Sequence, residues 1–292
     1  MNKNDKSFLL AKYRDYAQLI KMRLSLLVVF SASMSYLWAT HRNVKPQTIF
    51  LLSIGGFLVT GAANVINQIL ERTSDKLMKR TRLRPLPDER MHVREAMIIS
   101  LICGFAGLYI LLKINLLCAI LGCTAMIIYG FIYTPLKKKT WLTIVPGAIA
   151  GSLPVVIGSV AAKGGISAEA VTLFLIQFIW QFPHTWSIAW LQNDEYNKSG
   201  IQMLPSGGKC KGTAFIIMIS TFLMVPAAFL LSMYESAGIH VCWMVALAGL
   251  ILSVFSYAHY KKQSDKTAVR LMLSSIAYLP VILIILVIEK ML

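Results

Sequence analysis

The sequence predicts an all-α, polytopic membrane protein of about nine transmembrane helices. Its composition is 57% hydrophobic and 14% charged, and its mean hydropathy is +0.64. Soluble domains usually carry about 25% charged residues, so a chain this apolar could not hide its side chains in one aqueous core. The apolar residues also fall in runs of about 20, the length that crosses a bilayer. The lipid bilayer is therefore the expected solvent.

Nine apolar runs can be placed along the chain. The backbone in each must be helical, because unpaired peptide groups are costly in hydrocarbon. The third and fourth runs lie close together, and Lys113 and Asn115 mark the turn between them. The predicted spans are 24–40, 48–69, 96–112, 115–134, 142–162, 168–190, 213–233, 238–258 and 270–288.

The distribution of positive charge tests this division. With a cytoplasmic N-terminus, 24 of the 29 Lys and Arg residues fall in segments on the inside. Positive residues favour the cytoplasmic side, so the pattern predicts an internal N-terminus and an external C-terminus. The net charge of +16 has the same explanation, with anionic lipid or phosphorylated substrates as a second contribution. No basic recognition face is visible, so no nucleic-acid partner is expected.

A single membrane domain over residues 1–292 is expected, because no internal repeat or soluble segment interrupts the spans. Two segments on the predicted cytoplasmic side are longer than the others, about 71–95 and 191–212, and both carry acidic residues. Long loops in compact proteins are often functional. We therefore expect these two loops to cap an active site at the cytoplasmic ends of the helices.

The second span ends in a polar stripe. Asn67, Glu71 and Asp75 are spaced four residues apart and so share one helical face. Asn64 and Gln68 join this stripe. Carboxylate and amide oxygens suit a hard cation such as Mg²⁺, which completes its shell with water and substrate phosphate oxygens. The stripe therefore predicts a magnesium site.

Basic residues follow these acids at once. Lys79, Arg80 and Arg84 lie in the segment after Asp75. Carboxylates for a metal followed by cations for phosphate outline a site for a diphosphate and its metal. The alternative is a hydrated helix end whose two acids pair with Lys79 or Arg72.

These residues resemble those of a known family. Asn67, Glu71 and Asp75, followed by residues 78–81 and 85–87, resemble the UbiA superfamily of intramembrane prenyltransferases, and more narrowly its haem O synthase (protohaem IX farnesyltransferase) branch. That branch usually has Asp at the position of Glu71. Glutamate is also an oxygen ligand, so the metal site is retained, but the longer side chain changes how far the carboxylate extends.

Further stretches carry the same resemblance. Residues 133–140 and 147–158 are similar to the family's Y-T-x-x-L-K-R-x-T and A-G-x-x-P-x-x-x-G patterns. Residues 181–184 and 194–205 are similar to its P-H and D-Y-x-x-x-x-I-x-M-L-P patterns, and residues 21–23 stand where K-P-R is common. The resemblance covers most of the chain and implies a UbiA-type prenyltransferase bundle.

The sixth span carries a second polar stripe, formed by Gln177, Gln181 and His184. Ionisable residues within membrane spans are functional candidates. The His184 imidazole could ligate haem iron, hold a haem propionate or shuttle a proton, and the plain alternative is a hydrogen bond to a helix neighbour. The same helix carries tryptophans that suit either stacking on a porphyrin or farnesyl chain or simple packing, namely Trp180, Trp186 and Trp190.

The other histidines are expected to be solvated or interfacial. His41 and His240 lie near the outer ends of predicted spans, His92 lies in the basic loop, and His259 lies at an inside end.

The resemblance implies roles for individual residues. The expected Mg²⁺ ligands are Asn67, Glu71 and Asp75, with Asp194 as a candidate second-metal ligand. The expected catalytic residues are Asn67, Glu71, Asp75 and His184. Cations expected to hold the diphosphate are Lys79, Arg80, Arg84, Lys137, Lys138 and Lys139. Other expected substrate contacts are Arg23, Asn64, Gln181, Asp194 and Tyr196. Gln192 and Tyr196 stand where other UbiA branches carry a D-x-x-x-D pair, which puts a full second metal cluster in doubt.

The implied reaction is Mg²⁺-dependent transfer of a farnesyl group from farnesyl diphosphate to a vinyl group of haem b. Water then adds, giving haem O for terminal oxidases or as a precursor of haem A. The implied location is a bacterial cell membrane, with the active site on the cytoplasmic side. The alternatives are prenylation of an aromatic or quinone precursor, and a transporter or channel. Docking to a haem A synthase or an oxidase assembly partner, the reacting vinyl group and the oligomeric state stay open.

Overall fold

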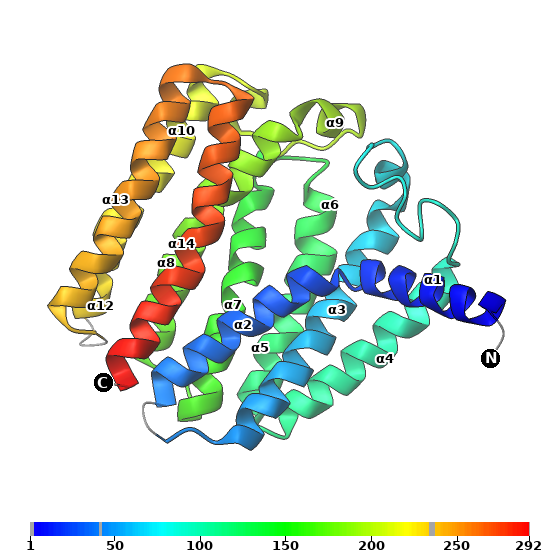
Figure 1. Ribbon diagram of the computed structural model, residues 1–292, viewed down its shortest axis with the longest axis horizontal. Coiled ribbons are helices and arrows are strands. Elements are labelled where there is room, and N and C mark those ends of the chain that lie inside the picture. The colour runs from blue at the N-terminus through cyan, green and yellow to red at the C-terminus, as the bar shows by residue number, and fades with distance from the viewer. Residues whose placement is uncertain (1–2, 41–42, 234–236, 292) are drawn as a thin grey trace.

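Long helices lying alongside one another make up the fold (Figure 1). The structure, a computed structural model, describes residues 3–40, 43–233 and 237–291. The long helices are α1 (Lys3–Leu19), α2 (Met22–Thr40), α3 (Pro46–Lys76), α4 (Val93–Leu112), α5 (Leu116–Ile127), α7 (Ile144–Lys163), α8 (Ala168–Leu191), α10 (Lys211–Phe222), α13 (Ile239–Lys262) and α14 (Asp265–Met291). The short elements are η1 (Ile128–Tyr133), α6 (Thr134–Leu136), η2 (Trp141–Thr143), α9 (Asn193–Lys198), η3 (Pro205–Gly207), α11 (Met224–Ala228) and α12 (Leu230–Met233).

The prediction of an all-α protein with about nine spans is confirmed. In the described residues, eight helical segments are long and apolar enough to cross a membrane. The ninth predicted span is α8, whose 24 residues are long enough but include the polar stripe around Gln181. It packs against α7, α10 and α14 inside the bundle. A polar helix enclosed by apolar ones is where a membrane protein places its chemistry. The orientation of the N-terminus stays a prediction.

The helix ends follow the local sequence. The α3 helix has Pro46 in its first turn, where a missing N–H costs nothing. The Asn115 side chain accepts from the Cys118 amide and caps α5. The α7 helix closes at Gly164, whose φ of +80° is the left-handed conformation that glycine adopts without strain. These signals keep the turns between spans short.

Close approach of α2 and α7 depends on one glycine. A Cβ atom added at Gly158 would lie 2.0 Å from the backbone oxygen of Ala32. One turn away, the Ser35 hydroxyl donates to the Val155 carbonyl over 2.5 Å. Small and hydroxylated residues at a contact between membrane helices let the two backbones meet. This contact braces one wall of the central cavity described below.

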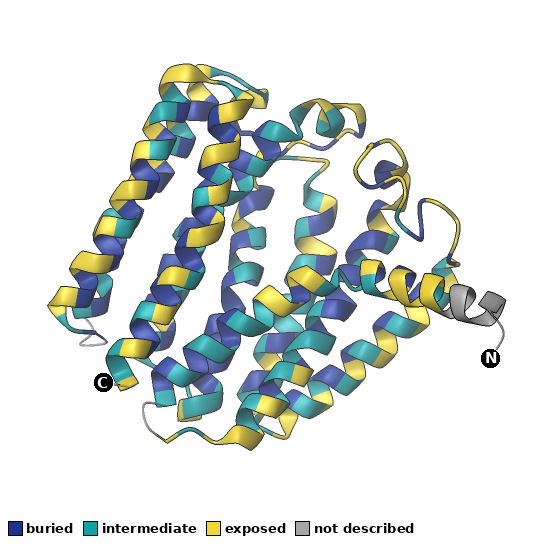
Figure 2. Cartoon of the chain, viewed as in Figure 1, coloured by how far each residue is buried: buried dark blue, intermediate teal, exposed yellow. Residues whose placement is uncertain are grey.

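The outward faces of the helices are apolar. Large apolar side chains such as Phe50, Phe105 and Trp243 are exposed, and Phe105 is 73% exposed. Figure 2 shows exposed positions along the outer helices and buried positions on their inward faces. A soluble protein rarely leaves so much apolar surface uncovered. The protein is therefore a multi-pass membrane protein.

An additional helix precedes the first span. No helix is predicted from the sequence in this part, but α1 covers most of it and extends outward from the end of α2, near the start of α4 (Figure 1). Asp15 forms an ion pair with Arg90, and the Tyr16 hydroxyl donates to Glu95 over 2.9 Å. These contacts fasten α1 to the start of α4 and to the loop before it.

Candidate active site

The stripe on α3 lies buried at the end of the bundle where that helix emerges. Asn67, Glu71 and Asp75 are 0%, 7% and 1% exposed. The helix continues to Lys76, beyond the predicted end of the span, so all three side chains project from regular helix on one face. Buried carboxylates require partners.

Asn67, Glu71 and Asp75 each contact a basic side chain from a different segment. Lys21, in the turn between α1 and α2, donates to Asn67 Oδ1 over 2.8 Å. Lys137, just after α6, lies 2.9 Å from Glu71 Oε1. Arg84, in the loop before α4, lies 2.8 Å from Asp75 Oδ2. We call these three contacts the cation ladder.

The ladder shows which cations pair with the two acids. The hydrated-end interpretation paired them with Lys79 or Arg72. Neither contact forms, because Arg72 turns back to the Ile69 carbonyl and the side chain of Lys79 is exposed. Asp75 instead pairs with Arg84 in the loop that follows α3, and Glu71 pairs with Lys137 from a segment far away in the sequence.

Two amides of α3 hold the turn that carries Lys21. Asn64 Nδ2 donates to the Ile20 carbonyl and to Ser25 Oγ, over 3.2 and 3.3 Å. Gln68 Nε2 donates to the Leu19 carbonyl over 2.5 Å. Lys21 itself has a φ of +48°, a conformation that costs free energy for a non-glycine residue. The α3 helix thus holds a strained turn in the place where its lysine reaches Asn67.

A π-helical turn shapes the facing wall. Thr134, the first residue of α6 directly after η1, donates its hydroxyl to the Tyr129 carbonyl five residues earlier, over 2.8 Å, and accepts from Asn67 Nδ2 over 3.0 Å. The rings of Tyr129 and Tyr133 stack with centroids 5.3 Å apart. The Lys137 ammonium lies 4.4 Å from the Tyr133 ring centroid. π-Helical turns within α-helices are frequent at functional sites.

Burial and neighbouring charges shift the pKa values of the two lysines in the ladder. Burial, followed by the positive charges of Arg84 and Lys137, lowers the pKa of Lys21 to about 7. Burial also lowers the pKa of Lys137, but the Glu71 carboxylate outweighs that effect and holds this pKa well above its usual value. Lys137 is therefore charged at physiological pH, while Lys21 titrates near neutrality.

The remaining predicted cations do not contact the ladder. These exposed residues are Arg23, Lys79, Arg80, Lys138 and Lys139. Of the three residues where K-P-R is common, the one that reaches the site is Lys21, not the predicted Arg23. The position of Lys21 depends on the strained turn and could not be recognised from spacing.

The segment 191–212 contacts the segment 71–95 and the residue Lys137 of the ladder. Glu195 Oε1 accepts from the Lys79 backbone amide over 3.2 Å, and the Gln202 amide donates to the Lys137 carbonyl over 2.7 Å. Asp194, the predicted second ligand, is exposed on α9. Tyr196 is half-buried on the same short helix. The assignments of Asp194 and Tyr196 stay predictions.

A cavity of about 420 Å³ lies beside the ladder, within the range typical of ligand sites. Its walls come from α2, α3, α5, η1, α7, α8 and α14. Gly151 leaves room for Gln181, because a Cβ atom there would lie 2.0 Å from Gln181 Nε2. The polar and aromatic lining residues are Phe30, Ser31, Thr60, Asn64, Tyr129, Tyr133, Gln177, Trp180, Gln181, His184 and Thr185. Gln177, Gln181 and His184 of the α8 stripe line this cavity, whereas among the described residues of the α3 stripe the one that lines it is Asn64.

His184 lies in the wall of this cavity and is held by another helix. Its Nδ1 lies 2.9 Å from Ser275 Oγ on α14, and its ring stacks on Trp180 with centroids 4.6 Å apart. The His184 side chain therefore hydrogen-bonds to another helix, α14, and not to a neighbour on its own helix. Trp186 and Trp190, by contrast, are buried in the hydrophobic core.

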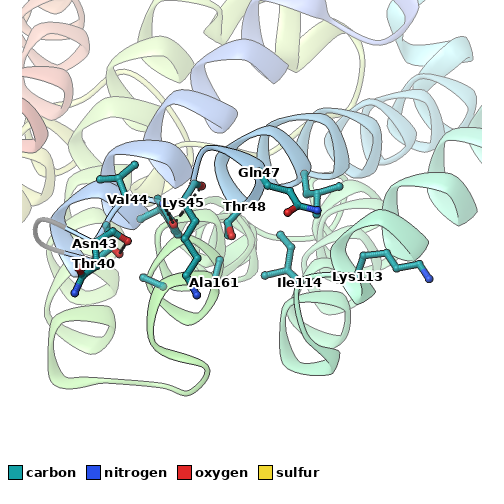
Figure 3. Close-up of a pocket in the computed structure, with 12 residues that line it drawn as sticks. Thr40, Asn43, Val44, Lys45, Gln47, Thr48, Lys113, Ile114 and Ala161 are labelled. Atoms are coloured by element: carbon teal, nitrogen blue, oxygen red, sulfur yellow. Dashed lines mark hydrogen bonds between the residues drawn. The ribbon is translucent and has the colours of Figure 1, made fainter.

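A wider cavity of about 690 Å³ opens at the opposite end of the bundle (Figure 3). It is lined by Lys45 and Thr48 near the start of α3 and by Lys113 in the turn before α5. Its lining contains no carboxylate, and the ladder lies at the other end of α3. Size alone therefore does not identify the site.

The expectation for His259 was wrong, since this side chain is fully buried on α13. Its Nδ1 lies 3.0 Å from Thr267 Oγ1, and its ring meets Trp190 edge-on. The helix continues to Lys262 and α14 covers its end, which the spacing of charges did not indicate. His41 lies outside the described residues.

The donor set fits Mg²⁺ only together with a phosphate. In the described part of the chain, no three His, Cys, Asp or Glu residues gather into a metal site. Glu71 and Asp75 supply two carboxylates, each with two oxygens and several lone pairs, so pairing with one cation leaves capacity. One or two carboxylates completed by substrate phosphate is the usual protein site for this ion.

Comparison with known proteins identifies the family. The model of the UbiA prenyltransferase family matches residues 28–277. The chain belongs to the UbiA prenyltransferase family. Among curated UbiA relatives, a protoheme IX farnesyltransferase of Cytophaga hutchinsonii is 41% identical, covering 96% of this chain and 99% of that protein. A protein of the same name from Flavobacterium psychrophilum is 39% identical, covering 96% and 95%.

Solved UbiA structures share the fold. A digeranylgeranylglyceryl phosphate synthase superimposes with a TM-score of 0.80 at 19% identity, covering 96% of this chain and 99% of that one. A UbiA homologue from Archaeoglobus fulgidus, bound to GPP and Mg²⁺, gives 0.72 at 15% identity, covering 94% and 99%. The predicted family and bundle are therefore confirmed.

Proposed function

We propose that this protein transfers a farnesyl group from farnesyl diphosphate to a vinyl group of haem b, giving haem O. The observation that carries the proposal is the cation ladder beside the central cavity, which offers carboxylates for a metal and cations for a diphosphate. The acceptor follows from the relatives, which are named protoheme IX farnesyltransferases and match nearly the whole chain. The membrane is that of a bacterial cell, with the ladder on the cytoplasmic side.

We assign the diphosphate to the ladder. Lys137 and Arg84 already lie within hydrogen-bonding distance of carboxylates, so a small change of partner would bring them to phosphate oxygens. Asn67, Glu71 and Asp75 would hold Mg²⁺, as a related UbiA structure binds GPP with Mg²⁺. Bound there, Mg²⁺ would neutralise charge on the leaving diphosphate. The loops 71–95 and 191–212 cap this end through the Glu195–Lys79 contact.

The farnesyl chain then lies in the cavity. Its allylic C–O bond breaks, and the electron pair leaves with the diphosphate held by Lys137 and Arg84. The outer vinyl carbon supplies a π-electron pair to the new C–C bond, and the inner carbon becomes positive. Water bonds to that carbon and loses a proton, which leaves a hydroxyethylfarnesyl group. The apolar walls delay water from reaching the first cation.

A reconstituted assay tests the proposal. Purified protein in detergent receives farnesyl diphosphate and haem b, and the release of diphosphate and the mass of the haem product are measured. The expected result is haem O formation that stops when Mg²⁺ is chelated. A hydroxybenzoate acceptor in place of haem b tests the aromatic alternative. Diphosphate release with that acceptor but not with haem b would contradict the proposed acceptor.

The variant Asp75→Ala tests the site. Removing this carboxylate should lower kcat by about 10²-fold or more, since it removes stabilisation of charge in the transition state. Asp88→Ala is the matched control, because Asp88 lies in the same loop region but is exposed and pairs only with Arg90 over 2.7 Å. Normal farnesylation by Asp75→Ala protein would exclude this residue as a metal ligand.

A further inference from the structure

One serine of α14 holds two aromatic side chains of α8. Ser275 Oγ lies 2.9 Å from His184 Nδ1. The backbone carbonyl of the same serine accepts from Trp180 Nε1 over 2.8 Å. Trp180 and His184 stack with an interplanar angle of 14°. The orientation of the His184 ring is therefore set from two sides, by its stack and by its hydrogen bond.

The hydrogen bonds of Ser275 determine which nitrogen of His184 carries the proton. Ser275 Oγ donates to the Met272 carbonyl over 2.7 Å. A hydroxyl group has one hydrogen to donate. Since that hydrogen points to Met272, the contact with His184 requires Nδ1 to be the donor. The neutral ring then has its hydrogen on Nδ1 and an unprotonated Nε2 with a free lone pair.

The surroundings keep this imidazole neutral. Among the described residues that line the cavity, none is Asp, Glu, Lys or Arg. The nearest ring is the uncharged indole of Trp180. A protonated imidazole in an apolar cavity without a counter-ion would be costly. His184 therefore offers the cavity an electron pair and no hydrogen.

This arrangement separates the three roles considered for His184. A haem propionate is a carboxylate and needs a hydrogen-bond donor, which Nε2 lacks in this tautomer. Iron, in contrast, is ligated by a neutral imidazole whose second nitrogen donates to a protein acceptor. Ser275 is such an acceptor. A proton shuttle would need a basic or acidic partner to exchange the proton, and the described lining of the cavity offers neutral amides, phenols and aliphatic hydroxyls.

We propose that His184 Nε2 is an axial ligand of the haem iron and that Ser275 is the positioning residue that sets its tautomer. This inference rests on the proposed function, because haem b is the acceptor there. Ligation at His184 would anchor the porphyrin on the α8 side of the cavity, across from the cation ladder on α3. The porphyrin edge would then be held toward the farnesyl chain by a bond that takes no part in the chemistry.

Haem-titration spectra of the purified full-length protein test the ligand. Wild-type protein should give an absorption spectrum with imidazole bound to iron. His184→Ala should lose that signature, and added imidazole should restore it by filling the vacated space. His184→Met keeps the side-chain volume and should give the distinct spectrum of thioether ligation. His259→Ala is the matched control, since this second buried histidine also bonds a hydroxyl through Nδ1 but lies outside the cavity.

The affinity of the protein for haem, in addition to the spectrum, tests the positioning role of Ser275. Ser275→Ala should weaken haem binding by about 10–100-fold, the usual effect of removing a partner that orients a metal ligand. Ser275→Thr keeps the hydroxyl and should recover most of the affinity. Ser274→Ala is the neighbouring control, because the Ser274 hydroxyl bonds only its own helix at Arg270.

The outcomes separate the inference from the proposed function. A spectrum unchanged in both His184→Ala and His184→Met would overturn ligation, even if haem farnesylation proceeds. Equal haem affinity of Ser275→Ala and Ser274→Ala would overturn the positioning role. Failure of wild-type protein to farnesylate haem, with the imidazole signature present, would contradict the proposed reaction while leaving the ligand assignment intact.

Discussion

The Glu71–Lys137 pair gives the most quantitative test of the ladder. The side chains of Lys137 and Glu71 are 14% and 9% exposed, so both charges lie largely out of water. Removing one partner leaves the other charge buried and unpaired, which costs about 3–5 kcal/mol. Lys137→Met and Glu71→Gln should each lower the free energy of unfolding by this amount. At about 2–4 °C for each kcal/mol, the loss in Tm is roughly 6–20 °C.

The double variant provides the decisive comparison. Carrying both Lys137→Met and Glu71→Gln, it has no buried charge at this position and should be more stable than either single variant. Unfolding would be followed in detergent by tryptophan fluorescence. Lys76→Met is the control, because its pair with Glu89 is closer, at 2.6 Å against 2.9 Å, but exposed, and exposed pairs contribute about 0–1 kcal/mol. Equal losses for Lys137→Met and Lys76→Met, or additive losses in the double variant, would refute this reasoning.

Two further predictions concern Lys21 and Gly158. Since its pKa is about 7, Lys21 loses its charge as the pH rises through that value, so KM for farnesyl diphosphate should rise above about pH 7. Lys21→Arg stays charged and should flatten this dependence, and parallel pH profiles of the two proteins would argue against the assignment. A Cβ atom at Gly158 would meet the Ala32 carbonyl at 2.0 Å, so Gly158→Ala should cost about 1–3 kcal/mol of stability through overpacking. Gly165→Ala, with open space around its Cβ, should leave Tm unchanged, and equal Tm values for the two variants would contradict the packing argument.

The sequence predicted the bundle well because a bilayer imposes simple lengths and charge rules. The predicted span 24–40 corresponds to α2, and 142–162 corresponds to α7. The polar stripes on the second and sixth spans were also recognisable, since four-residue spacing places side chains on one helical face whatever the tertiary structure. The α8 stripe lines the cavity, while the α3 stripe reaches the cavity at Asn64 and continues into the cation ladder.

The partners of those stripes could not be predicted in the same way. Lys21 reaches Asn67 only because α3 holds a turn in a strained conformation, and no local pattern indicates such a turn. Ser275 looks like any hydroxyl residue in an apolar helix until the packing of α14 on α8 brings it to His184. The burial of His259 likewise depends on which helix covers its end. Pairing between segments far apart in sequence is a property of the fold.

If the ladder holds Mg²⁺ and diphosphate as proposed, the two should bind together. Without them, the carboxylates and cations neutralise one another within a site that is nearly closed to water. Mg²⁺ arriving alone would join a site already rich in positive charge, and a diphosphate arriving alone would meet two carboxylates. The metal–diphosphate complex brings a positive charge to the carboxylates and negative charge to the cations at the same time. Mg²⁺ and diphosphate should therefore each bind more tightly when the other is present. The ladder would thereby discriminate against free phosphates and free metal ions, and admit the metal–prenyl diphosphate complex as a unit.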